Sequence, residues 1–434
     1  MNFSQSDIDS HPKARRTSVL AVTSELPWPL NTGGHIRSFH LLRSLAAQFD
    51  LRLVTGVDSL DDPGIARLEE EGIRVCPVES GRRHPMSEML RVLGAAAKFE
   101  PYVMFHRHNR RVLRQEVQRQ LKLQTPDLVY LDHLDPFAFR NLFPDSRIVC
   151  DLHNVYSKLA TRVGTERRWP VSTYLDREAR LLAKMEQRVA REASALMAVS
   201  SEEQAEFQRL GAPNAHLVPN GVDCAAFSNF PVGRTSTPPV ILYLGALSWQ
   251  PNAKAAEFLA RDVMPKILDE HSDARLTIVG RNPGAEVKLL ARLPGVELHA
   301  NVPDVGVYLR DSTVMAVPLD SGGGTRLKIL EAFAAGLPVV STPIGCEGIA
   351  CAHGEHLWIG ERDRFAESLL DSISSPQLAT ELAERARLLA KSTYDWPVIG
   401  ERACAAVQSA VCSATPHTSP SSSPGTERLD VRTV

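Results

Sequence analysis

The sequence predicts an α/β protein of two doubly wound domains, each a parallel sheet with helices on both faces. The length of 434 residues favours two domains over one. Short β-branched runs alternate with longer helical stretches, which is typical of parallel βαβ units. A Pro/Gly/Ser/Thr segment at residues 230–239 interrupts the alternation and is typical of an interdomain linker. We therefore expect domains at residues 17–235 and 236–390.

Strands are expected where a buried β-branched run ends at a turn. The first series comprises Ser18–Thr23, Leu51–Val57, Ile73–Pro77, Leu128–Leu131, Ile148–Asp151 and Ala195–Val199. The second series comprises Val240–Leu244, Leu276–Val279, Val296–His299, Val314–Pro318 and Pro338–Ser341. A helical period of apolar residues predicts helices at Ile36–Gln48, Tyr174–Glu192, Ala253–Leu268, Arg326–Ala335 and Arg364–Ser372.

The composition is that of a globular protein, with 43% hydrophobic and 23% charged residues. The formal charge of −2 gives no global attraction to nucleic acid or membrane. No apolar run approaches the roughly 18 residues of a spanning helix, and Val19–Val22 is too short for a signal peptide. The seven cysteines are scattered without zinc-ligand spacing, so free thiols are expected. We therefore expect a cytoplasmic protein without a nucleic-acid partner.

The two ends of the chain, residues 1–16 and 413–434, are polar and lack periodicity, so we expect disordered tails. Asp7-Ile8-Asp9 has the D-x-D pattern of some metal sites. No strand precedes it, and we expect no metal there.

Adjacent glycines follow the first predicted strand and precede a helix. Gly33 and Gly34 stand directly before the helical pattern that begins at Ile36. Glycines at such a turn let backbone N–H groups approach an anion at the positive end of the helix dipole. A flexible loop that needs positive φ is the alternative. The spacing does not fit G-x-G-x-x-G, which argues against a dehydrogenase.

A second glycine cluster follows the strand Val314–Pro318 and is the strongest local signal in the chain. Gly322, Gly323 and Gly324 are followed by Thr325, Arg326 and Lys328, and Glu331 comes one turn later. Backbone donors and two cations suit a diphosphate, and a carboxylate suits the hydroxyls of a ribose. The alternative is an ordinary Lys–Glu pair on a solvated helix face. Arg326 and Lys328 can converge only if Arg326 lies in the loop or first turn, because they stand about 200° apart on a helix.

Two further strand ends carry polar side chains that could reach a cleft. His153 and Asn154 follow the strand Ile148–Asp151, and Arg281 follows Leu276–Val279. A structural histidine and a simple turn are the alternatives.

A basic stretch runs from Arg82 to Lys122, with ten Lys/Arg against three Glu and interleaved apolar residues. Such a stretch could contact an anionic membrane at its inner face or an acidic acceptor. A solvated helical face is the alternative.

These residues together resemble the retaining sugar-nucleotide glycosyltransferases of family 4, whose two-domain fold is called GT-B. The resemblance covers roughly residues 18–405. It is carried by Gly33-Gly34, Asp151-Leu-His-Asn154, Val199-Ser200, Pro219–Asp223, Ile278–Arg281, Val302-Pro-Asp304 and Gly322–Val340, the last containing the Gly-Gly-Gly-Thr-Arg-Leu-Lys form of a subgroup. The resemblance implies a nucleotide in the second domain with Glu331 on its ribose, and an acceptor in the first. It also implies that Tyr394-Asp-Trp396 begins a final helix, within residues 391–412, that crosses back to the first domain.

The chain departs from this family at two places. Many members open the second domain with Gly-Arg and Lys-Gly cations that hold the donor diphosphate, whereas Leu244–Asn252 has no cation. Arg326 and Lys328 are the candidates to replace them. The family's paired glutamates stand eight positions apart, and the position eight before Glu331 is Gly323.

We therefore expect a metal-independent glycosyltransferase that moves a sugar from a nucleoside-diphosphate sugar to an acceptor hydroxyl, with retention, in polysaccharide or glycoconjugate synthesis. Arg326, Lys328 and the Gly33-Gly34 turn would stabilise the departing diphosphate. His153 would line the donor-sugar pocket, and Arg281, Gly323, Gly324, Thr325 and Glu331 would bind the donor. The acceptor would be a glycan or a lipid-linked sugar, and no cofactor is expected. A nucleoside-diphosphate-sugar epimerase or a non-catalytic nucleotide-sugar-binding protein is the alternative.

Overall fold

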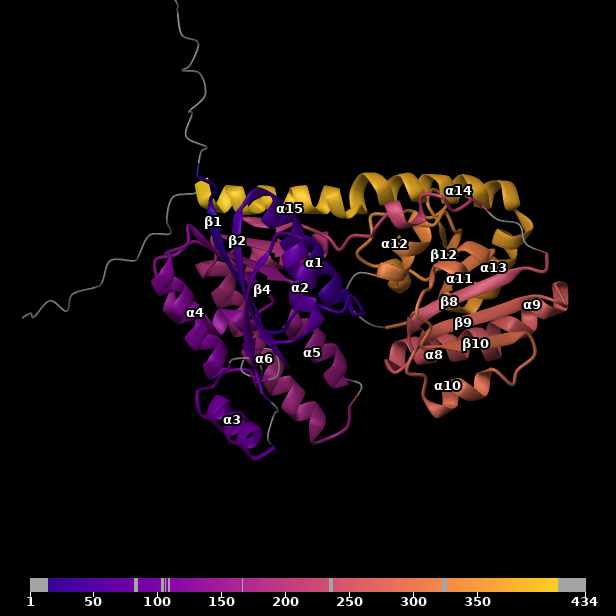
Figure 1. Cartoon of the computed structure of the whole chain (residues 1–434). Coiled ribbons are helices and arrows are strands. Elements are labelled where there is room, and N and C mark those ends of the chain that lie inside the picture. Colours follow the sequence, from indigo (N-terminus) through magenta and orange to yellow (C-terminus); the bar gives the residue numbers. More distant parts are fainter. Residues whose placement is uncertain are drawn as a thin grey trace, which may run out of the picture.

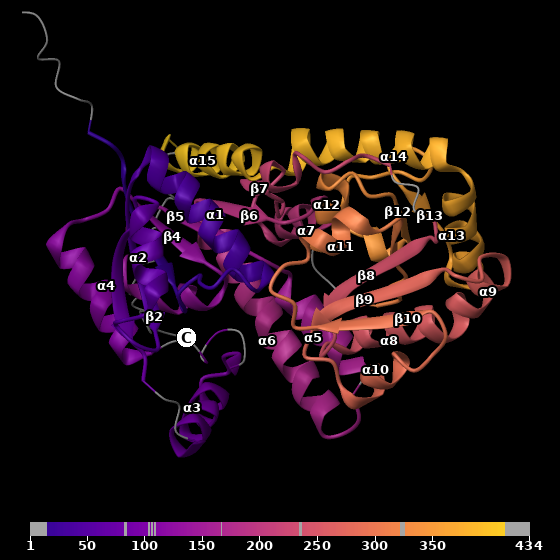
Figure 2. The same cartoon turned by 45° about the vertical axis from the view of Figure 1, so that its right-hand side comes forward.

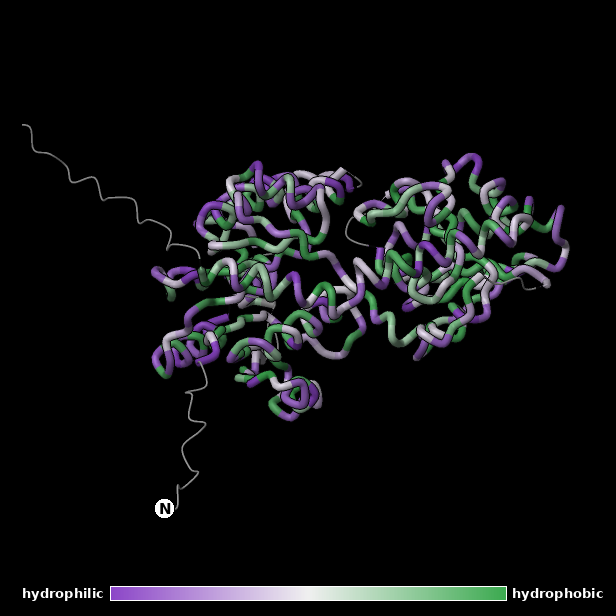
Figure 3. The backbone as a smooth tube through the Cα atoms, turned by 90° about the horizontal axis from the view of Figure 1, so that it is seen from above, coloured by the Kyte–Doolittle hydropathy of each residue, from purple (hydrophilic) through white to green (hydrophobic). Residues whose placement is uncertain are grey.

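The computed structural model describes residues 15–412, apart from 82–84, 103, 104, 106, 108, 109, 166, 234–236 and 322–325. Two parallel sheets, each with helices packed around it, form two lobes (Figure 1). Seen from above, the lobes lie side by side (Figure 3). Of the two predicted tails, only Arg15 and Arg16 belong to the described residues. None of the helices in the described ranges is long and apolar enough to cross a bilayer.

The first sheet has seven strands in the order β3-β2-β1-β4-β5-β6-β7. The bounds are β1 Ser18–Thr23, β2 Asp50–Val57, β3 Arg74–Glu79, β4 Leu128–Asp132, β5 Ile148–Leu152, β6 Ala195–Ala198 and β7 Ala215–Leu217. The helices are α1 Gly33–Gln48, α2 Pro63–Glu70, α3 Pro85–Ala97, α4 Arg111–Leu123, α5 Tyr156–Thr165, α6 Val171–Glu192 and α7 Ser201–Leu210. The strand order reverses between β1 and β4, where ligands bind in doubly wound sheets.

The second sheet has six parallel strands in the order β10-β9-β8-β11-β12-β13. The bounds are β8 Val240–Ala246, β9 Arg275–Arg281, β10 Val296–Ala300, β11 Val314–Val317, β12 Val339–Ser341 and β13 Trp358–Ile359. The helices are α8 Gln250–Phe258, α9 Met264–Glu270, α10 Ala285–Leu290, α11 Gly306–Asp311, α12 Leu327–Ala334, α13 Phe365–Ser374, α14 Pro376–Leu389 and α15 Trp396–Cys412. The switch point of this sheet lies between β8 and β11. Figure 2 shows β8, β9 and β10 side by side on one side of it.

The predicted strands and the predicted helices match the observed elements to within a few residues. The helix predicted at Ala253–Leu268 is found as one helical run over residues 250–270, in which the π-helical turn Leu259–Val263 lies between α8 and α9. Pro265 lacks an N–H and its ring clashes with the carbonyl four residues earlier, which explains the wider turn. The observed starts of α1 and α12 bear on the site and are described with it.

The last helix joins the two lobes. α15 continues the line of α14 and crosses back over the first lobe, where it packs on α1 (Figure 1). Its side chains, among them Ile399, Ala403 and Val407, belong to the same apolar core as β1 and α1. Trp396, the first residue of α15, stacks on His40 with ring centroids 4.4 Å apart.

The segment before the predicted linker already packs on the second lobe. Val222 belongs to the core of the second sheet, and Phe227 and Phe230 pack against that core. Arg387 on α14 donates to the carbonyl oxygens of Phe227 and Phe230 at 2.6 and 2.9 Å. The second lobe therefore includes chain that precedes residue 230.

Candidate functional site

The glycines after β1 form the first turn of α1. The helix begins at Gly33, three residues before the predicted start at Ile36, because Thr32 caps it and its Oγ accepts the His35 N–H at 3.2 Å. Neither glycine has a positive φ, so the flexible-loop alternative does not explain them. A Cβ atom on Gly33 would lie 3.3 Å from Leu327 Cδ1 of α12, which belongs to the other lobe. The glycine therefore permits a close approach of the two helix starts.

The start of α12 differs from the prediction by one residue. Arg326 is the residue before the helix, with φ −83° and ψ 75°, and α12 begins at Leu327. The Arg326 side chain is buried, and its Nη2 donates to the Ile344 carbonyl at 3.4 Å. Within a helix, Arg326 and Lys328 would point to nearly opposite sides. Because Arg326 lies before the helix, its side chain can lie on the same side as Lys328. The predicted donor residues Gly323, Gly324 and Thr325 lie outside the described residues, as does Gly322.

Lys328 is held by two residues that the sequence did not single out. Its Nζ donates to Asn252 Oδ1 at 3.1 Å and lies 4.7 Å from the centre of the Tyr243 ring. Asn252 is itself fixed, since its Nδ2 donates to the Ala246 carbonyl at 3.1 Å. Burial and, to a lesser extent, the charge of Arg326 lower the pKa of Lys328 to about 7. Asn252 and Tyr243 thus orient the Lys328 ammonium group, but neither residue carries a negative charge that would balance its positive charge.

A pocket of about 200 Å³ brings together three of the predicted donor-binding side chains. Arg281, Lys328 and Glu331 line it, together with apolar side chains such as Val302 and Val305. Burial raises the pKa of Glu331 to about 7, against the influence of Lys328. Arg281 also donates to the Asn31 carbonyl, just before α1, so this side chain bridges the two lobes. We call this hollow the β8–β11 pocket after the switch point of the second sheet, although its lining comes from β8, β9, α12 and the segment after β10.

Replacing Glu331 by Gln is expected to weaken nucleotide binding by about 1.5–3 kcal/mol, because the carboxylate is a stronger acceptor for ribose hydroxyls than an amide. Isothermal titration calorimetry with a nucleoside diphosphate measures this. Glu286→Gln, on the exposed start of α10, is the control and should leave affinity unchanged. Unchanged affinity in Glu331→Gln would remove Glu331 from the site.

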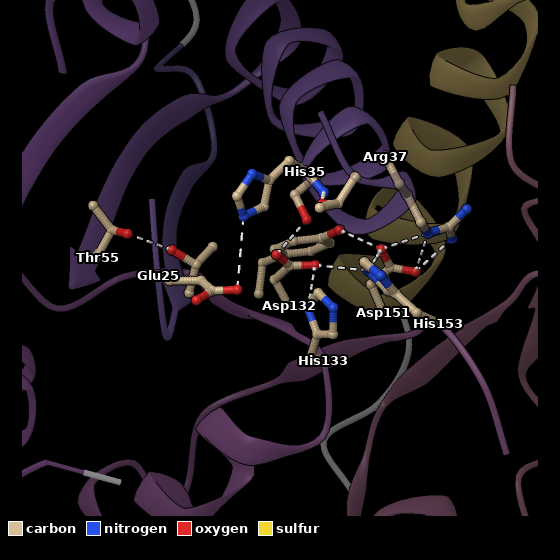
Figure 4. A network of polar contacts seen from close by, with 12 residues as sticks. Glu25, His35, Arg37, Thr55, Asp132, His133, Asp151 and His153 are labelled. Carbon is tan, nitrogen blue, oxygen red and sulfur yellow. Dashed lines mark hydrogen bonds and ion pairs between the residues drawn. The ribbon is translucent and has the colours of Figure 1, made fainter. Parts of the chain in front are cut away.

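The first lobe contributes a buried network of charged and polar side chains below α1 (Figure 4). Arg37 donates to Asp151 through Nε and Nη2, at distances from 2.5 to 3.1 Å. His153 Nε2 lies 3.0 Å from Asp132 Oδ1 and 3.2 Å from Asp151 Oδ2. Burial alone would raise the pKa of Asp151, but Arg37 and His153 lower it to about 2. Burial opposes the protonation of His153, yet Asp151 and Asp132 raise its pKa.

His133 directly follows β4 and lies between this network and the hollow beside Gly34. Its φ of 74° is left-handed, and its ring centre is 3.6 Å from that of His153. Its Nδ1 lies 3.4 Å from Asp132 Oδ1, and its Nε2 would lie 3.6 Å from a Cβ on Gly34. The hollow beside Gly34 is lined by His133 and Asp132. His153 is placed behind it, with Nδ1 3.8 Å from the same Cβ position.

Asp132, His133 and His153 could together hold a metal ion, because their ligand atoms lie within 4.8 Å of one another. Hydrogen bonding accounts for the same grouping: Asp132 accepts from Ser38 Oγ at 2.6 Å and lies beside both histidines. Burial alone would raise the pKa of Asp132, but the two histidines hold it well below its usual range.

The basic stretch is partly described, since Arg82 and Arg83 lie outside the described residues. Arg91 pairs with Glu88 and Arg119 with Glu116, each at 2.8 Å. The helix α3, which projects from the first lobe in Figure 1, exposes Met86, Met89, Leu90 and Leu93. A peripheral membrane contact through Arg82–Lys122 stays a prediction.

Two lobes, each a parallel sheet with helices packed around it, have the arrangement seen in GT-B glycosyltransferase structures. Residues 32–226 match the model described as Glycosyltransferase Family 4, and residues 238–375 match the one described as Glycosyl transferases group 1. The chain therefore carries a family 4 domain in its first lobe and a group 1 domain in its second lobe.

Among its relatives is phosphatidyl-myo-inositol mannosyltransferase of Mycobacterium leprae, which is 28% identical over 208 residues. That match covers 45% of this chain and 54% of the relative, so the chain spans about half the relative's length. Two solved structures share the fold. Anabaena HepE in complex with UDP and glucose has a TM-score of 0.61 at 15% identity, covering 90% of this chain and 99% of HepE. WaaG, a glycosyltransferase involved in lipopolysaccharide biosynthesis, has a TM-score of 0.60 at 18% identity, covering 89% and 98%.

Proposed function

We propose that this enzyme transfers a sugar from a nucleoside-diphosphate sugar to an acceptor hydroxyl, with retention and without a metal. The proposal rests on one observation: the start of α1 lies against the start of α12 across the two lobes, with Gly33 beside Leu327. Arg326 and Lys328 stand on either side of Leu327 in the chain, at the start of α12. Helix N-termini and fixed cations are the groups that stabilise a departing diphosphate.

The β8–β11 pocket would hold the nucleoside part of the donor. Its apolar walls suit a base and the Glu331 carboxylate suits ribose hydroxyls, while Lys328 at its edge would reach the diphosphate. Positive charge fixed by the protein would replace the divalent metal that other transferases need. Retention is part of the proposal because the motifs between Gly33 and Val340, including the Gly-Gly-Gly-Thr-Arg-Leu-Lys subgroup form, resemble a retaining family.

The relatives suggest which donors to try first and which role to expect. HepE was solved with UDP and glucose, so UDP conjugates come first. WaaG is involved in lipopolysaccharide biosynthesis and the Mycobacterium leprae relative is a lipid mannosyltransferase by name. A role in polysaccharide or glycoconjugate synthesis, in the cytoplasm, is the corresponding proposal here.

A thermal-shift screen against UDP, GDP, ADP, TDP and their sugar conjugates tests the donor. A ligand at about 100 times its dissociation constant should add about 2.7 kcal/mol of stability. We expect one nucleotide family to stabilise the protein, equally with EDTA and with added Mn²⁺, and Arg326→Ala/Lys328→Ala to lose the shift. A shift abolished by EDTA would contradict metal independence and would implicate Asp132, His133 and His153. No shift with any nucleotide at millimolar concentration would contradict the donor assignment.

Turnover separates the alternatives. An epimerase would interconvert the donor sugar without an acceptor, and a binding protein would be stabilised by the donor without consuming it. The proposed transferase consumes donor at a rate that depends on acceptor concentration.

A further inference from the structure

The first lobe has a second hollow beside the start of α1, which we call the α1 groove. It has two connected parts, since Ser24, Glu25 and His35 line both. The inner part, of about 240 Å³, reaches Gly34, and the outer part, of about 300 Å³, reaches Trp28. Figure 4 shows Glu25 and His35 together at this end of the buried network. Each part is the size of a small-ligand subsite.

A buried carboxyl group in the inner part is incompletely bonded. Asp135 is only 6% exposed, and its Oδ2 has no hydrogen-bond partner within the described structure. Leaving a buried carboxyl oxygen without a donor is costly, because it has given up its hydrogen bonds to water. A ligand hydroxyl that donates to Asp135 Oδ2 would remove that cost. The groove therefore favours a ligand that supplies hydrogen-bond donors.

The charges along the α1 groove favour a ligand without negative charge. Among the described residues, five carboxyl groups line the two parts: Glu25, Asp58, Asp62, Asp132 and Asp135. Asp132 lies beside His133 and His153, and burial raises the pKa of Asp135 to about 7, so the outer part carries most of the negative charge. Among the described residues one arginine lines the two parts, Arg110, and it donates to the carbonyl oxygens of Ser80 and Gly81. His35 Nε2 lies 3.6 Å from Glu25 Oε1, and this contact raises the pKa of His35, so its ring also has an anionic neighbour. A phosphate or carboxylate on the ligand would meet like charge, whereas sugar hydroxyls can donate to these carboxylates.

The inner part opens at the place where the donor would react. Gly34 and His133 line it, and Gly33, the preceding residue, lies against Leu327 at the start of α12. A hydroxyl held by Asp135 is therefore on the side of the cleft that faces the proposed diphosphate. The outer part adds the Trp28 ring, whose apolar face can cover one side of a sugar.

We propose that the α1 groove is the acceptor site and that the acceptor is an uncharged sugar chain of at least two residues. This rests on the proposed function. The terminal sugar lies in the inner part and the preceding sugar lies against Trp28. The acceptor oxygen bonds to the anomeric carbon of the donor sugar as the bond from that carbon to the diphosphate oxygen breaks. The hydroxyl proton leaves on the nucleoside diphosphate, so atoms and charge balance.

Saturation-transfer difference NMR on the full chain tests this with millimolar mixtures. One mixture holds maltose, cellobiose, lactose and mannobiose, and the other holds glucose 6-phosphate and glucuronate; both contain UDP in excess, so that sugar phosphates do not bind at the proposed donor site. We expect signals from at least one neutral disaccharide, none from the anionic sugars, and a loss of at least tenfold in disaccharide affinity in Asp135→Asn and in Trp28→Ala. Asp61→Asn, in the same loop as Asp58 and Asp62 but outside the groove lining, is the matched control and should bind as the wild type does.

Three results would overturn the proposal: preferential binding of the anionic sugars, disaccharide binding that survives both substitutions, or no disaccharide signal at all. The nucleotide thermal shift is measured on the same variants and should be unchanged, because neither residue lines the β8–β11 pocket. Failure of the donor assignment would appear there, as a missing nucleotide shift in the wild type, and is thus distinguished from failure of the acceptor assignment.

Discussion

Replacing Lys328 by Met is expected to lower the rate constant of sugar transfer, kcat, by about 100- to 1000-fold, the loss typical of one preorganised group that stabilises developing negative charge. The methionine keeps the apolar contact with Tyr243 but removes the ammonium group that Asn252 orients. Lys254→Met is the matched control, because Lys254 lies exposed on α8 and outside the pocket lining. A kcat within threefold of the wild type would remove Lys328 from the reaction.

We also expect the protein to take up a proton at Lys328 when it binds the diphosphate. A lysine with only a structural role would not produce this uptake. In the free protein burial lowers the pKa of Lys328 to about 7, so at pH 8 the amine is mostly neutral. A bound diphosphate favours the charged form and raises that pKa, so binding takes up a proton at pH 8 and affinity falls as pH rises above 7. Calorimetry in two buffers of different ionisation enthalpy measures the uptake. It should vanish in Lys328→Met and persist in Lys254→Met.

The sequence predicted the parts of the fold whose signal is local. Buried parallel strands are continuous β-branched runs, and those predicted were found within a few residues of their observed bounds. The strands β7, with three residues, and β13, with two, are too short to show a pattern. The π-helical turn between α8 and α9 was not predicted, although Pro265 marks it in the sequence.

The candidate site also contains residues that a local pattern predicts and contacts that it does not. Glycines and cations at strand ends can be recognised in the sequence because the carboxyl ends of parallel strands share one edge of a sheet. His133 follows β4 directly, so the rule that selected His153 could have found it as well. By contrast, the contacts from Arg37 to Asp151 and from Lys328 to Asn252 join residues 114 and 76 positions apart. No local pattern relates such residues, and only the folded chain pairs them.

Replacing Arg37 by Met is expected to lower the free energy of unfolding by about 3–5 kcal/mol, the usual cost of removing one partner of a buried ion pair. Arg37 is 1% exposed, and its guanidinium donates to Asp151 and also to the carbonyls of Val218 and Pro219. Without it, Asp151 is a buried carboxylate whose remaining partners are His153 and Tyr130. Urea unfolding followed by circular dichroism measures the loss, and Arg43→Met is the control. Arg43 lies on the same helix in a partly exposed pair with Glu71, and such pairs contribute less than about 1 kcal/mol.

The pH dependence of this loss tests its cause. In the wild type the pKa of Asp151 is about 2, below its ordinary 3.8, so its ion pair contributes stability above pH 3.8 that is lost as pH falls toward 2. In Arg37→Met burial is no longer opposed by Arg37, so the pKa of Asp151 rises and the carboxyl can take up a proton at lower pH. The difference in stability between variant and wild type should therefore be smaller at pH 5 than at pH 8. Arg37→Met/Asp151→Asn, which carries no buried charge at either position, should recover part of the loss at pH 8. A loss that is the same at both pH values, with no recovery in the double variant, would mean that Arg37 stabilises the lobe by packing and not by charge.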